Sequence, residues 1–274
     1  MMKLSYQVST PEVYKAPGVT SYQGNFEESL QALKDCGYDG VELMVRDPKA
    51  VDWNSLERSV AKYEYEVPMV CTGEIYGQDR LSFADPDDGC REEAIKRIKA
   101  AIDLATLFGK QINLGRVRGG FLPSIDRDKT YARIFEAVLL VTEYAAKKGV
   151  IIALEPVNTL GLNFINTTQE GLDFVKKVGS SNFKLMIDTA HMHIEDKNIP
   201  DSVKLSKDYI TFVHLADSNR RYPGAGACDF PSFVRLLEEI GYKGYVSIEV
   251  FPLPDQETAM RKSFEYIKPL ICHG

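Results

Sequence analysis

The chain has 274 residues, of which 44% are hydrophobic and 26% are charged, a composition typical of a folded globular protein and not of a disordered chain. Its net charge is −6 and it has no long block of lysines and arginines, which argues against nucleic acids or acidic membrane surfaces as partners and favours small molecules. Nowhere do about 18 apolar residues run together, and the five cysteines contain no C-x-x-C pair, so we expect a cytoplasmic protein with reduced thiols and no membrane span.

Eight short runs rich in apolar and β-branched residues recur along the chain, and we predict a β-strand at each of them. The runs cover residues 4–9, 40–45, 66–73, 110–115, 150–156, 183–188, 210–217 and 245–251. Between them lie charged, amphipathic stretches that predict helices, several of which end at a glycine. These stretches cover residues 26–37, 52–64, 91–109, 129–149, 168–179, 200–208, 230–241 and 256–270.

A strand followed by a helix, repeated along the whole chain, is the pattern of a parallel sheet with helical crossovers. Eight such units in about 250 residues favour a closed (β/α)8 TIM barrel of the α/β class over an open, doubly wound sheet. We expect residues 1–274 to form this single catalytic domain, because no linker or low-complexity stretch is present. The sixth unit is the least regular, since its strands lie close together in sequence and Pro200 interrupts the segment between them.

Four polar residues stand at or near the ends of strongly apolar runs in the second half of the chain. They are Glu155 in IIALEPVN, Asp188 in KLMIDTAH, His214 in TFVHLAD and Glu249 in YVSIEVF. A carboxylate or imidazole among apolar residues carries a desolvation cost unless a charge partner or a metal ion compensates it. In a barrel the carboxyl ends of strands five to eight meet on one side of the rim, so these four residues predict one shared cation.

Three carboxylates and one imidazole form a mixed site that suits Mn²⁺, Co²⁺ or Mg²⁺, with Zn²⁺ as a further candidate. Four protein ligands leave coordination positions free for a substrate with two neighbouring oxygens. Two further residues lie in register with the four, His191 in DTAH and Arg220 in HLADSNR, and both are placed to contact substrate oxygens. The ordinary alternatives are strand-end caps or solvated groups for the single residues, and a packed imidazole for His191.

The segments EPVN, DTAH, HLADSNR with the following PGAG-x-x-DF, and IEVF resemble those of the xylose-isomerase-like TIM-barrel superfamily. More narrowly, the chain resembles the ketose 3-epimerases of the D-tagatose and D-psicose type over essentially its whole length. The resemblance implies one divalent metal ion, usually Mn²⁺ or Co²⁺, held by Glu155, Asp188, His214 and Glu249. It implies substrate contacts from His191 and Arg220, and an assembly of two or four copies.

The chemistry implied by this resemblance is the epimerisation of a keto sugar. Glu155 and Glu249 would act as the acid and base pair. One carboxylate would remove the proton next to the ketone from one face, and the other would return it to the opposite face of the enediolate. A metal ion near the carbonyl would stabilise the negative charge that develops.

The chain departs from the resemblance in two places. Gly161 stands where the family often has a third glutamate near the substrate, and GRVRGG adds Arg116 and Arg118 at the rim. Together with the arginine of HLADSNR they could form a cationic pocket for an anionic keto sugar such as a keto-aldonate. The segments GRVRGG and VRDPKAVDW also resemble those of bacterial 5-keto-L-gluconate epimerases. The alternative is that these arginines are solvated or pair with acidic neighbours such as Glu74 or Asp217.

Several other reactions remain open because they share the same ligands. Aldose–ketose isomerases such as hydroxypyruvate isomerase, and dehydratases that act on inososes or dehydroshikimate, also begin by removing a proton beside a carbonyl. Endonuclease IV-like DNA repair enzymes belong to the same superfamily, but they need several additional histidines for a zinc cluster, and this chain has four histidines in all. The acidic net charge also argues against a DNA-binding enzyme.

Overall fold

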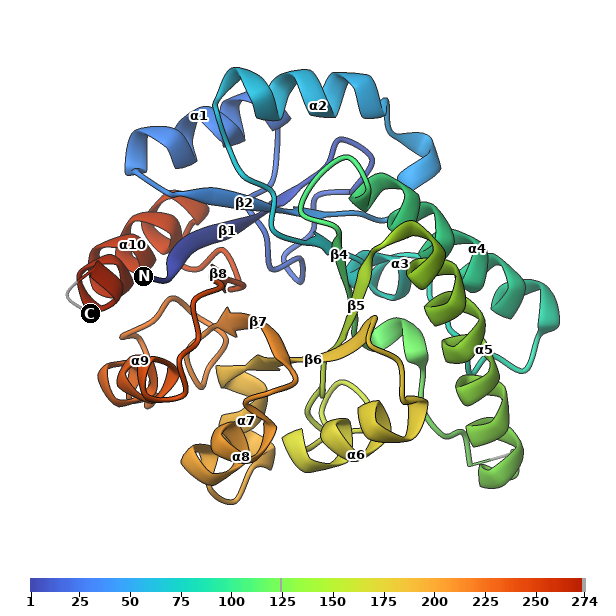
Figure 1. Ribbon diagram of the computed structural model, residues 1–274. Coiled ribbons are helices and arrows are strands. Elements are labelled where there is room, and N and C mark those ends of the chain that lie inside the picture. Colours follow the sequence, from blue (N-terminus) through green and yellow to red (C-terminus); the bar gives the residue numbers. More distant parts are fainter. Residues whose placement is uncertain (124, 273–274) are drawn as a thin grey trace.

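The computed structural model describes residues 1–123 and 125–272. A closed barrel of parallel strands forms its centre, in which each strand pairs with the next along the chain and β8 pairs with β1 (Figure 1). The strands are β1 (Lys3–Ser9), β2 (Gly40–Met44), β3 (Val70–Cys71), β4 (Gln111–Leu114), β5 (Ile151–Leu154), β6 (Phe183–Asp188), β7 (Ile210–Leu215) and β8 (Tyr245–Ile248). The predicted (β/α)8 barrel of the α/β class is therefore confirmed.

Helices surround the barrel on its outer side (Figure 1). They are α1 (Phe26–Cys36), α2 (Trp53–Lys62), α4 (Asp88–Ala105), α5 (Arg127–Lys148), α6 (Thr168–Val178), α8 (Ile199–Ser206), α9 (Phe230–Glu239) and α10 (Gln256–Cys272). A helix lies at each predicted helical stretch, although the stretch predicted over residues 91–109 is helical only as far as Ala105. The sixth unit is short, as expected, and Pro200 lies in the first turn of α8, where the N–H that proline lacks would have no helical partner anyway.

Four short helical turns lie in the loops that follow strands at the carboxyl end of the barrel, and the sequence patterns do not predict them. They are η1 (Pro48–Ala50) after β2, α3 (Gly73–Gly77) after β3, η2 (Arg116–Arg118) after β4 and α7 (Thr189–Glu195) after β6. The carboxyl ends of parallel barrel strands are where these folds build their sites. These turns therefore decide where rim residues such as Arg116 and His191 point.

Strand β3 is much shorter than predicted. Only Val70 and Cys71 form it, whereas the apolar run predicts residues 66–73. Pro68 has no N–H to donate to a neighbouring strand, and before it the chain makes only an isolated bridge between Gly40 and Glu66. The prediction for this strand is therefore correct in place but wrong in length.

Alternation along the strands separates two cores. Leu4, Tyr6 and Val8 of β1 belong to the main core between the barrel and its helices. A separate apolar cluster, which we call the lower half of the barrel interior, consists of Met69, Ala153, Met186 and Phe212. Side chains two residues apart on a strand point to the same side, so Glu155, Asp188 and His214 continue the inward rows of Ala153, Met186 and Phe212. On each of these three strands, one inward-pointing residue is therefore apolar and the next one toward the carboxyl end is ionisable.

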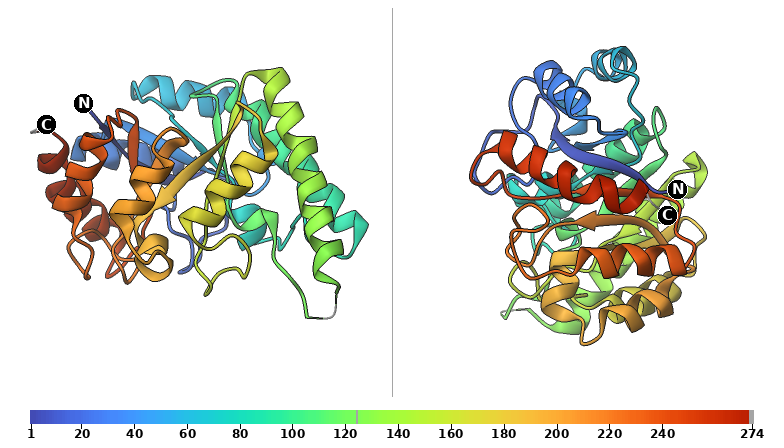
Figure 2. Two further views of the ribbon diagram at one scale, coloured as in Figure 1. Left: turned by 60° about the horizontal axis from the view of Figure 1, so that its bottom comes forward. Right: turned by 90° about the vertical axis from the view of Figure 1, so that its left-hand side faces the viewer.

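The two described ends of the chain lie close together in every view (Figure 2). β1 starts at the amino end of the barrel, and the last helix, α10, returns the chain beside it. Among the residues that the structure describes, no helix is both long and apolar enough to cross a membrane.

Candidate metal centre

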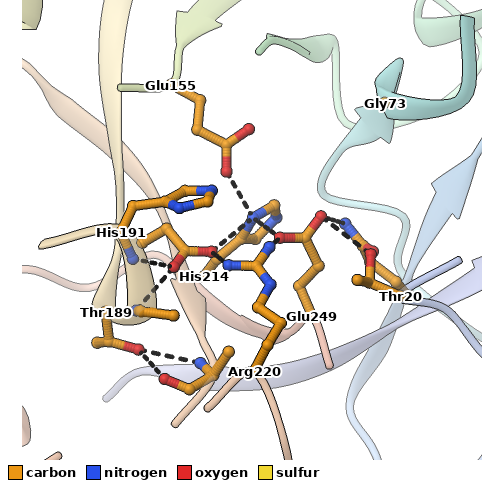
Figure 3. Close-up of polar contacts among 12 residues, drawn as sticks. Thr20, Gly73, Glu155, Thr189, His191, His214, Arg220 and Glu249 are labelled. Carbon is orange, nitrogen blue, oxygen red and sulfur yellow. Dashed lines mark hydrogen bonds and ion pairs between the residues drawn. The ribbon is translucent and has the colours of Figure 1, made fainter. Parts of the chain in front are cut away.

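Four side chains converge at the carboxyl ends of the last four strands. Glu155 directly follows β5, Asp188 ends β6, His214 lies near the end of β7, and Glu249 directly follows β8. Each offers one ligand atom, and these atoms all lie within 4.8 Å of one another. All four residues are buried, with no more than 7% of their surface exposed. Figure 3 shows Glu155 and Glu249 approaching the His214 imidazole from different directions.

The two nitrogens of His214 have different partners. Nδ1 lies 3.2 Å from Glu249 Oε2, 3.3 Å from Glu155 Oε1 and 3.7 Å from Asp188 Oδ2. Nε2 lies 3.0 and 3.1 Å from the two carboxylate oxygens of Glu42 on β2. A carboxylate on the far nitrogen commonly fixes the tautomer and the orientation of a metal-binding imidazole. Nδ1 is therefore the atom that could bind a metal ion.

Negative charge dominates this buried cluster. Burial alone would raise the pKa of Asp188, but Arg220 and the nearby histidines lower that pKa to about 2. Burial alone would lower the pKa of His214, yet the carboxylates of Glu42 and Glu155 raise it well above its usual value. A divalent cation would compensate the same carboxylates. Three carboxylate oxygens and one imidazole nitrogen fit such an ion.

Two buried amides hold the two glutamates of the cluster. Gln7 Nε2, from β1, donates to Glu249 Oε1 at 3.1 Å and to Glu42 Oε1 at 3.1 Å. Asn113 Nδ2, from β4, donates to Glu155 Oε2 at 3.3 Å. Sequence reasoning missed Gln7, Glu42 and Asn113, although each is a polar residue inside an apolar strand run. That pattern is the signal that could have found them.

A cavity of about 440 Å³ opens over the cluster. Its lining includes Glu155, Glu249, Asn113 and the predicted substrate residue His191. Burial lowers the pKa of the His191 imidazole to about 4, so the ring is neutral at neutral pH. Its Nδ1 is buried and makes no hydrogen bond to any residue that the structure describes. His191 therefore has an atom available for a molecule in the cavity.

The predicted substrate residue Arg220 lies against the cluster itself. Its Nη1 is 2.7 Å from Asp188 Oδ2, and its Nη2 contacts Glu249. The backbone of Arg220 has a φ of 61°, a left-handed conformation that is uncommon outside glycine and often marks functional sites. Asp217 stabilises this loop, since its carboxylate accepts hydrogen bonds from the N–H groups of Ser218, Gly224 and Cys228. Asp217 is thus occupied by the backbone and pairs with no described arginine.

The two arginines of GRVRGG have different environments. Arg116 lines the edge of the cavity, where its Nη2 donates to Glu74 Oε1 at 3.3 Å and to the Gly73 carbonyl at 3.2 Å. The structure therefore bears out the alternative of an acidic neighbour for this residue. Gly161 also lines the cavity, and without a side chain it contributes no charge there.

Arg118 does not line the cavity. Its side chain is completely buried, and its hydrogen bonds go to main-chain carbonyls, including those of Gly115 and Glu155. The prediction that Arg118 contacts substrate is wrong, because no donor of this guanidinium faces the cavity. A cationic pocket of three arginines does not form, since Arg220 and Arg116 also have carboxylate partners.

Known proteins with related sequences and structures share this barrel. Residues 30–270 match the family model described as xylose isomerase-like TIM barrel. A D-psicose 3-epimerase from Ruminiclostridium cellulolyticum is 37% identical over 87% of this chain and 83% of its own length. An L-ribulose 3-epimerase from Methylomonas sp. is 32% identical over 82% of this chain and 78% of its own length. A solved structure of an L-ribulose 3-epimerase superposes with a TM-score of 0.84 at 24% identity, covering 100% of this chain and 95% of that chain, which shows a common fold.

Proposed function

The chain belongs to the xylose isomerase-like TIM barrel family, and we propose that it is a divalent-metal-dependent epimerase that inverts the carbon next to the ketone of a keto sugar. One observation carries the proposal. Two buried glutamates flank a single cluster of ligand atoms that all lie within 4.8 Å of one another, beneath a cavity large enough for a small molecule. The curated relatives with 37% and 32% identity are named as ketose 3-epimerases, which are carbohydrate epimerases.

The metal ion would be held by Glu155, Asp188, His214 and Glu249. Mn²⁺ or Co²⁺ is the favoured ion, with Mg²⁺ or Zn²⁺ as alternatives, because three of the ligands are carboxylates and one is an imidazole. When bound, the ion would supply positive charge next to the substrate oxygens and so stabilise an enediolate.

Glu155 and Glu249 would move the proton. One carboxylate takes the proton from the carbon next to the ketone, and the other returns it to the opposite face. Asn113 and Gln7 donate hydrogen bonds to these carboxylates and so hold them in place beneath the cavity. The burial of both glutamates keeps bulk water away from the carbanionic carbon.

His191, Arg220 and Arg116 would bind the oxygens of the substrate. The neutral His191 ring offers its Nδ1, and Arg220 and Arg116 offer N–H groups at the cavity wall. Glu74 offsets the charge of Arg116, and Arg118 lies outside the cavity, so a neutral ketose is the favoured substrate. The partly exposed Arg116 keeps a keto-aldonate as the second candidate.

A single experiment in D₂O tests the reaction class. The protein, loaded with Mn²⁺ or Co²⁺, is incubated with D-fructose, D-tagatose, D-psicose, L-ribulose and a set of keto-aldonates. We expect deuterium at one carbon next to the ketone, together with the inverted epimer, and faster turnover of the neutral ketoses. Migration of the carbonyl would identify an aldose–ketose isomerase, and loss of water would identify a dehydratase. No exchange with any of these sugars would overturn the proposal.

The domain organisation, the assembly and the cellular location of the enzyme are part of the same proposal. We propose one catalytic domain over residues 1–274, a homo-oligomer of two or four copies, and a cytoplasmic location without nucleic-acid or membrane partners. The negative net charge argues against a nucleic-acid partner, and the five free cysteines suit a reducing compartment. Light scattering of the purified protein measures the number of copies directly.

A further inference from the structure

Arg118 is a buried cation whose partners are all main-chain carbonyls. Nε donates to Phe164 O at 3.2 Å, Nη1 donates to Gly115 O at 2.7 Å and to Glu155 O at 2.8 Å, and Nη2 donates to Phe164 O at 2.9 Å and Ile165 O at 2.7 Å. These bonds use all five N–H groups of the guanidinium. Arg118 is 0% exposed, and it forms no ion pair with any carboxylate in the described part of the chain.

The four carbonyls come from two neighbouring loops. Gly115 follows β4, while Glu155, Phe164 and Ile165 lie in the segment between β5 and α6, which we call the β5–α6 loop (residues 155–167). This loop forms one wall of the cavity through Val157, Asn158, Leu160 and Gly161. Arg118 therefore joins the base of the cavity wall to the residue that follows β5.

The β5–α6 loop contains one residue with an unfavourable backbone conformation, which its neighbours must stabilise. Ile165 has a φ of 57°, which is a genuine outlier for a β-branched residue. Its carbonyl accepts from Arg118 and also, at 3.2 Å, from the N–H of Val157. Asn163 binds the same loop to the one after β4, since its amide accepts from Phe121 N at 2.8 Å and donates to Phe121 O at 2.9 Å.

We propose that Arg118 is a positioning residue for Glu155. It fixes the peptide carbonyl of Glu155 and the closing residues of the β5–α6 loop, so that the Glu155 carboxylate stays against His214 and the cavity wall keeps its shape. For the step at Glu155 this inference rests on the proposed function, whereas the effect on the loop does not depend on it. Among the described residues, no arginine guanidinium donates a hydrogen bond to the main-chain carbonyl of Glu249, the other glutamate.

Arginine is required at this position because of its geometry. A lysine at the same place would keep the positive charge but would offer three N–H groups from one atom, which cannot reach four carbonyls in two loops. Arg118→Lys therefore separates the effect of the planar guanidinium with its five N–H groups from the effect of the positive charge. Arg91→Lys is the matched control, since Arg91 also donates to a main-chain carbonyl, that of Arg133, but between helices α4 and α5.

The first measurement uses amide hydrogen exchange on the metal-free protein. In Arg118→Lys we expect the Val157 amide and its neighbours in residues 157–166 to exchange about tenfold faster or more, while amides of α10 keep their wild-type rates. Arg91→Lys should leave the β5–α6 loop unchanged. Unchanged protection of this loop in Arg118→Lys would overturn the proposal, whatever the enzyme catalyses.

The second measurement follows deuterium during turnover in D₂O. If only Glu155 is displaced, transfer on one face slows, so the ratio of deuterium in recovered substrate to deuterium in product changes. We expect kcat to fall about 10–100-fold in Arg118→Lys together with a changed ratio, and neither change in Arg91→Lys. A general loss of folded protein would lower the rate and leave the ratio unaltered. A loosened loop with a wild-type rate and ratio would overturn the link to Glu155.

A third variant keeps the test valid if Arg118→Lys does not fold. Asn163 is exposed, and Asn163→Ala frees one side of the β5–α6 loop without touching the buried guanidinium. We expect faster exchange in residues 161–166 and a change of the isotope ratio in the same direction but of smaller size. A loosened loop with an unchanged ratio would contradict the positioning of Glu155 by this loop. If the wild-type enzyme incorporates no deuterium into any of the sugars, the proposed function is refuted, whereas the amide-exchange result for the loop still holds.

Discussion

The two halves of the barrel interior have opposite chemistry although the same strands build them. The lower half consists of Met69, Ala153, Met186 and Phe212 and needs no electrostatic compensation. We call the polar part of the interior the upper half, and it consists of Gln7, Glu42, Asn113, Glu155, Asp188, His214 and Glu249. Both halves are completely buried or nearly so. Burial alone therefore does not distinguish a packing position from a functional one in this barrel.

The difference between the halves lies in how each buried group is compensated. Apolar side chains in the lower half gain from burial, by about 25 cal/mol for each Å² removed from water. Carboxylates in the upper half lose hydration and depend on Arg220, on His214 and on amide donors such as Gln7. The lower half is thus stabilised by apolar packing alone, whereas the upper half carries negative charge that a cation can neutralise.

The largest effect is expected from removing a proton carrier in the upper half. Glu155→Gln and Glu249→Gln keep the shape of the side chain but remove its charge, so kcat should fall by about 10²–10⁴-fold in each. The matched control is Glu66→Gln at the opposite end of the barrel, where an exposed glutamate pairs with Lys3. Steady-state kinetics with saturating metal ion measure this. If both variants retain near wild-type activity, the glutamates of the upper half are not the proton carriers, and the proposed chemical role of this half is wrong.

A substitution in the lower half should affect stability and spare the chemistry. Met186→Ala leaves a cavity in a fully buried position and should lower the free energy of unfolding by about 2–5 kcal/mol. Met186→Leu keeps the volume and should cost less than about 1.5 kcal/mol. Urea unfolding measures both, and titration with Mn²⁺ of the folded protein should give the wild-type affinity. A large loss of metal affinity in Met186→Ala would show that the two halves are not separate.

Glu42, the carboxylate on the second nitrogen of His214, sharpens the comparison, because it contacts Nε2 of the imidazole and is not part of the cavity lining. Glu42→Gln removes the charge that orients His214 through Nε2 and should weaken Mn²⁺ binding about 10–100-fold. Isothermal titration calorimetry measures the change, again with Glu66→Gln as the control. Equal affinities in the two variants would mean that Glu42 is only a packed polar group.

The smallest effect concerns pH and the rim loop. Burial opposes ionisation of Asp217, but hydrogen bonds from the N–H groups of Cys228, Ser218 and other loop residues outweigh it and lower its pKa. A carboxylate with a lowered pKa stabilises the fold above its ordinary pKa, and this contribution disappears as the pH falls through the folded-state value. Unfolding measured between about pH 6 and pH 3 should therefore show a shallower acid slope in Asp217→Asn than in the wild type. An identical slope would contradict the assigned role.

Much of the fold is predictable because the same local pattern recurs with every unit. β-branched runs mark all eight strands, and amphipathic stretches, several of which end at a glycine, mark their helices. The third strand is predicted too long, since composition alone does not reveal how Pro68 interrupts the pairing. The short helices α3 and α7 are missed because turns of 5 and 7 residues leave no periodic pattern.

The site is predictable where a charge stands in an apolar run near a strand end. Glu155, Asp188, His214 and Glu249 meet this condition, and the structure brings their ligand atoms together. Glu42 and Gln7 meet a weaker form of it inside strands. Their importance depends on which face of the strand points into the barrel, and that follows only from the register of the closed sheet.

The barrel and the four converging ligands can be predicted from the order of the residues, because strand periodicity and the cost of burying charge both act locally. The different roles of Arg116 and Arg118, which are two positions apart in one segment, depend on the folded structure. The 3₁₀ turn η2 directs Arg116 toward Glu74 and the cavity, and Arg118 inward to carbonyls from another loop. The role of a guanidinium depends on which acceptors the fold brings within hydrogen-bonding distance, and those acceptors lie up to 47 residues away in sequence.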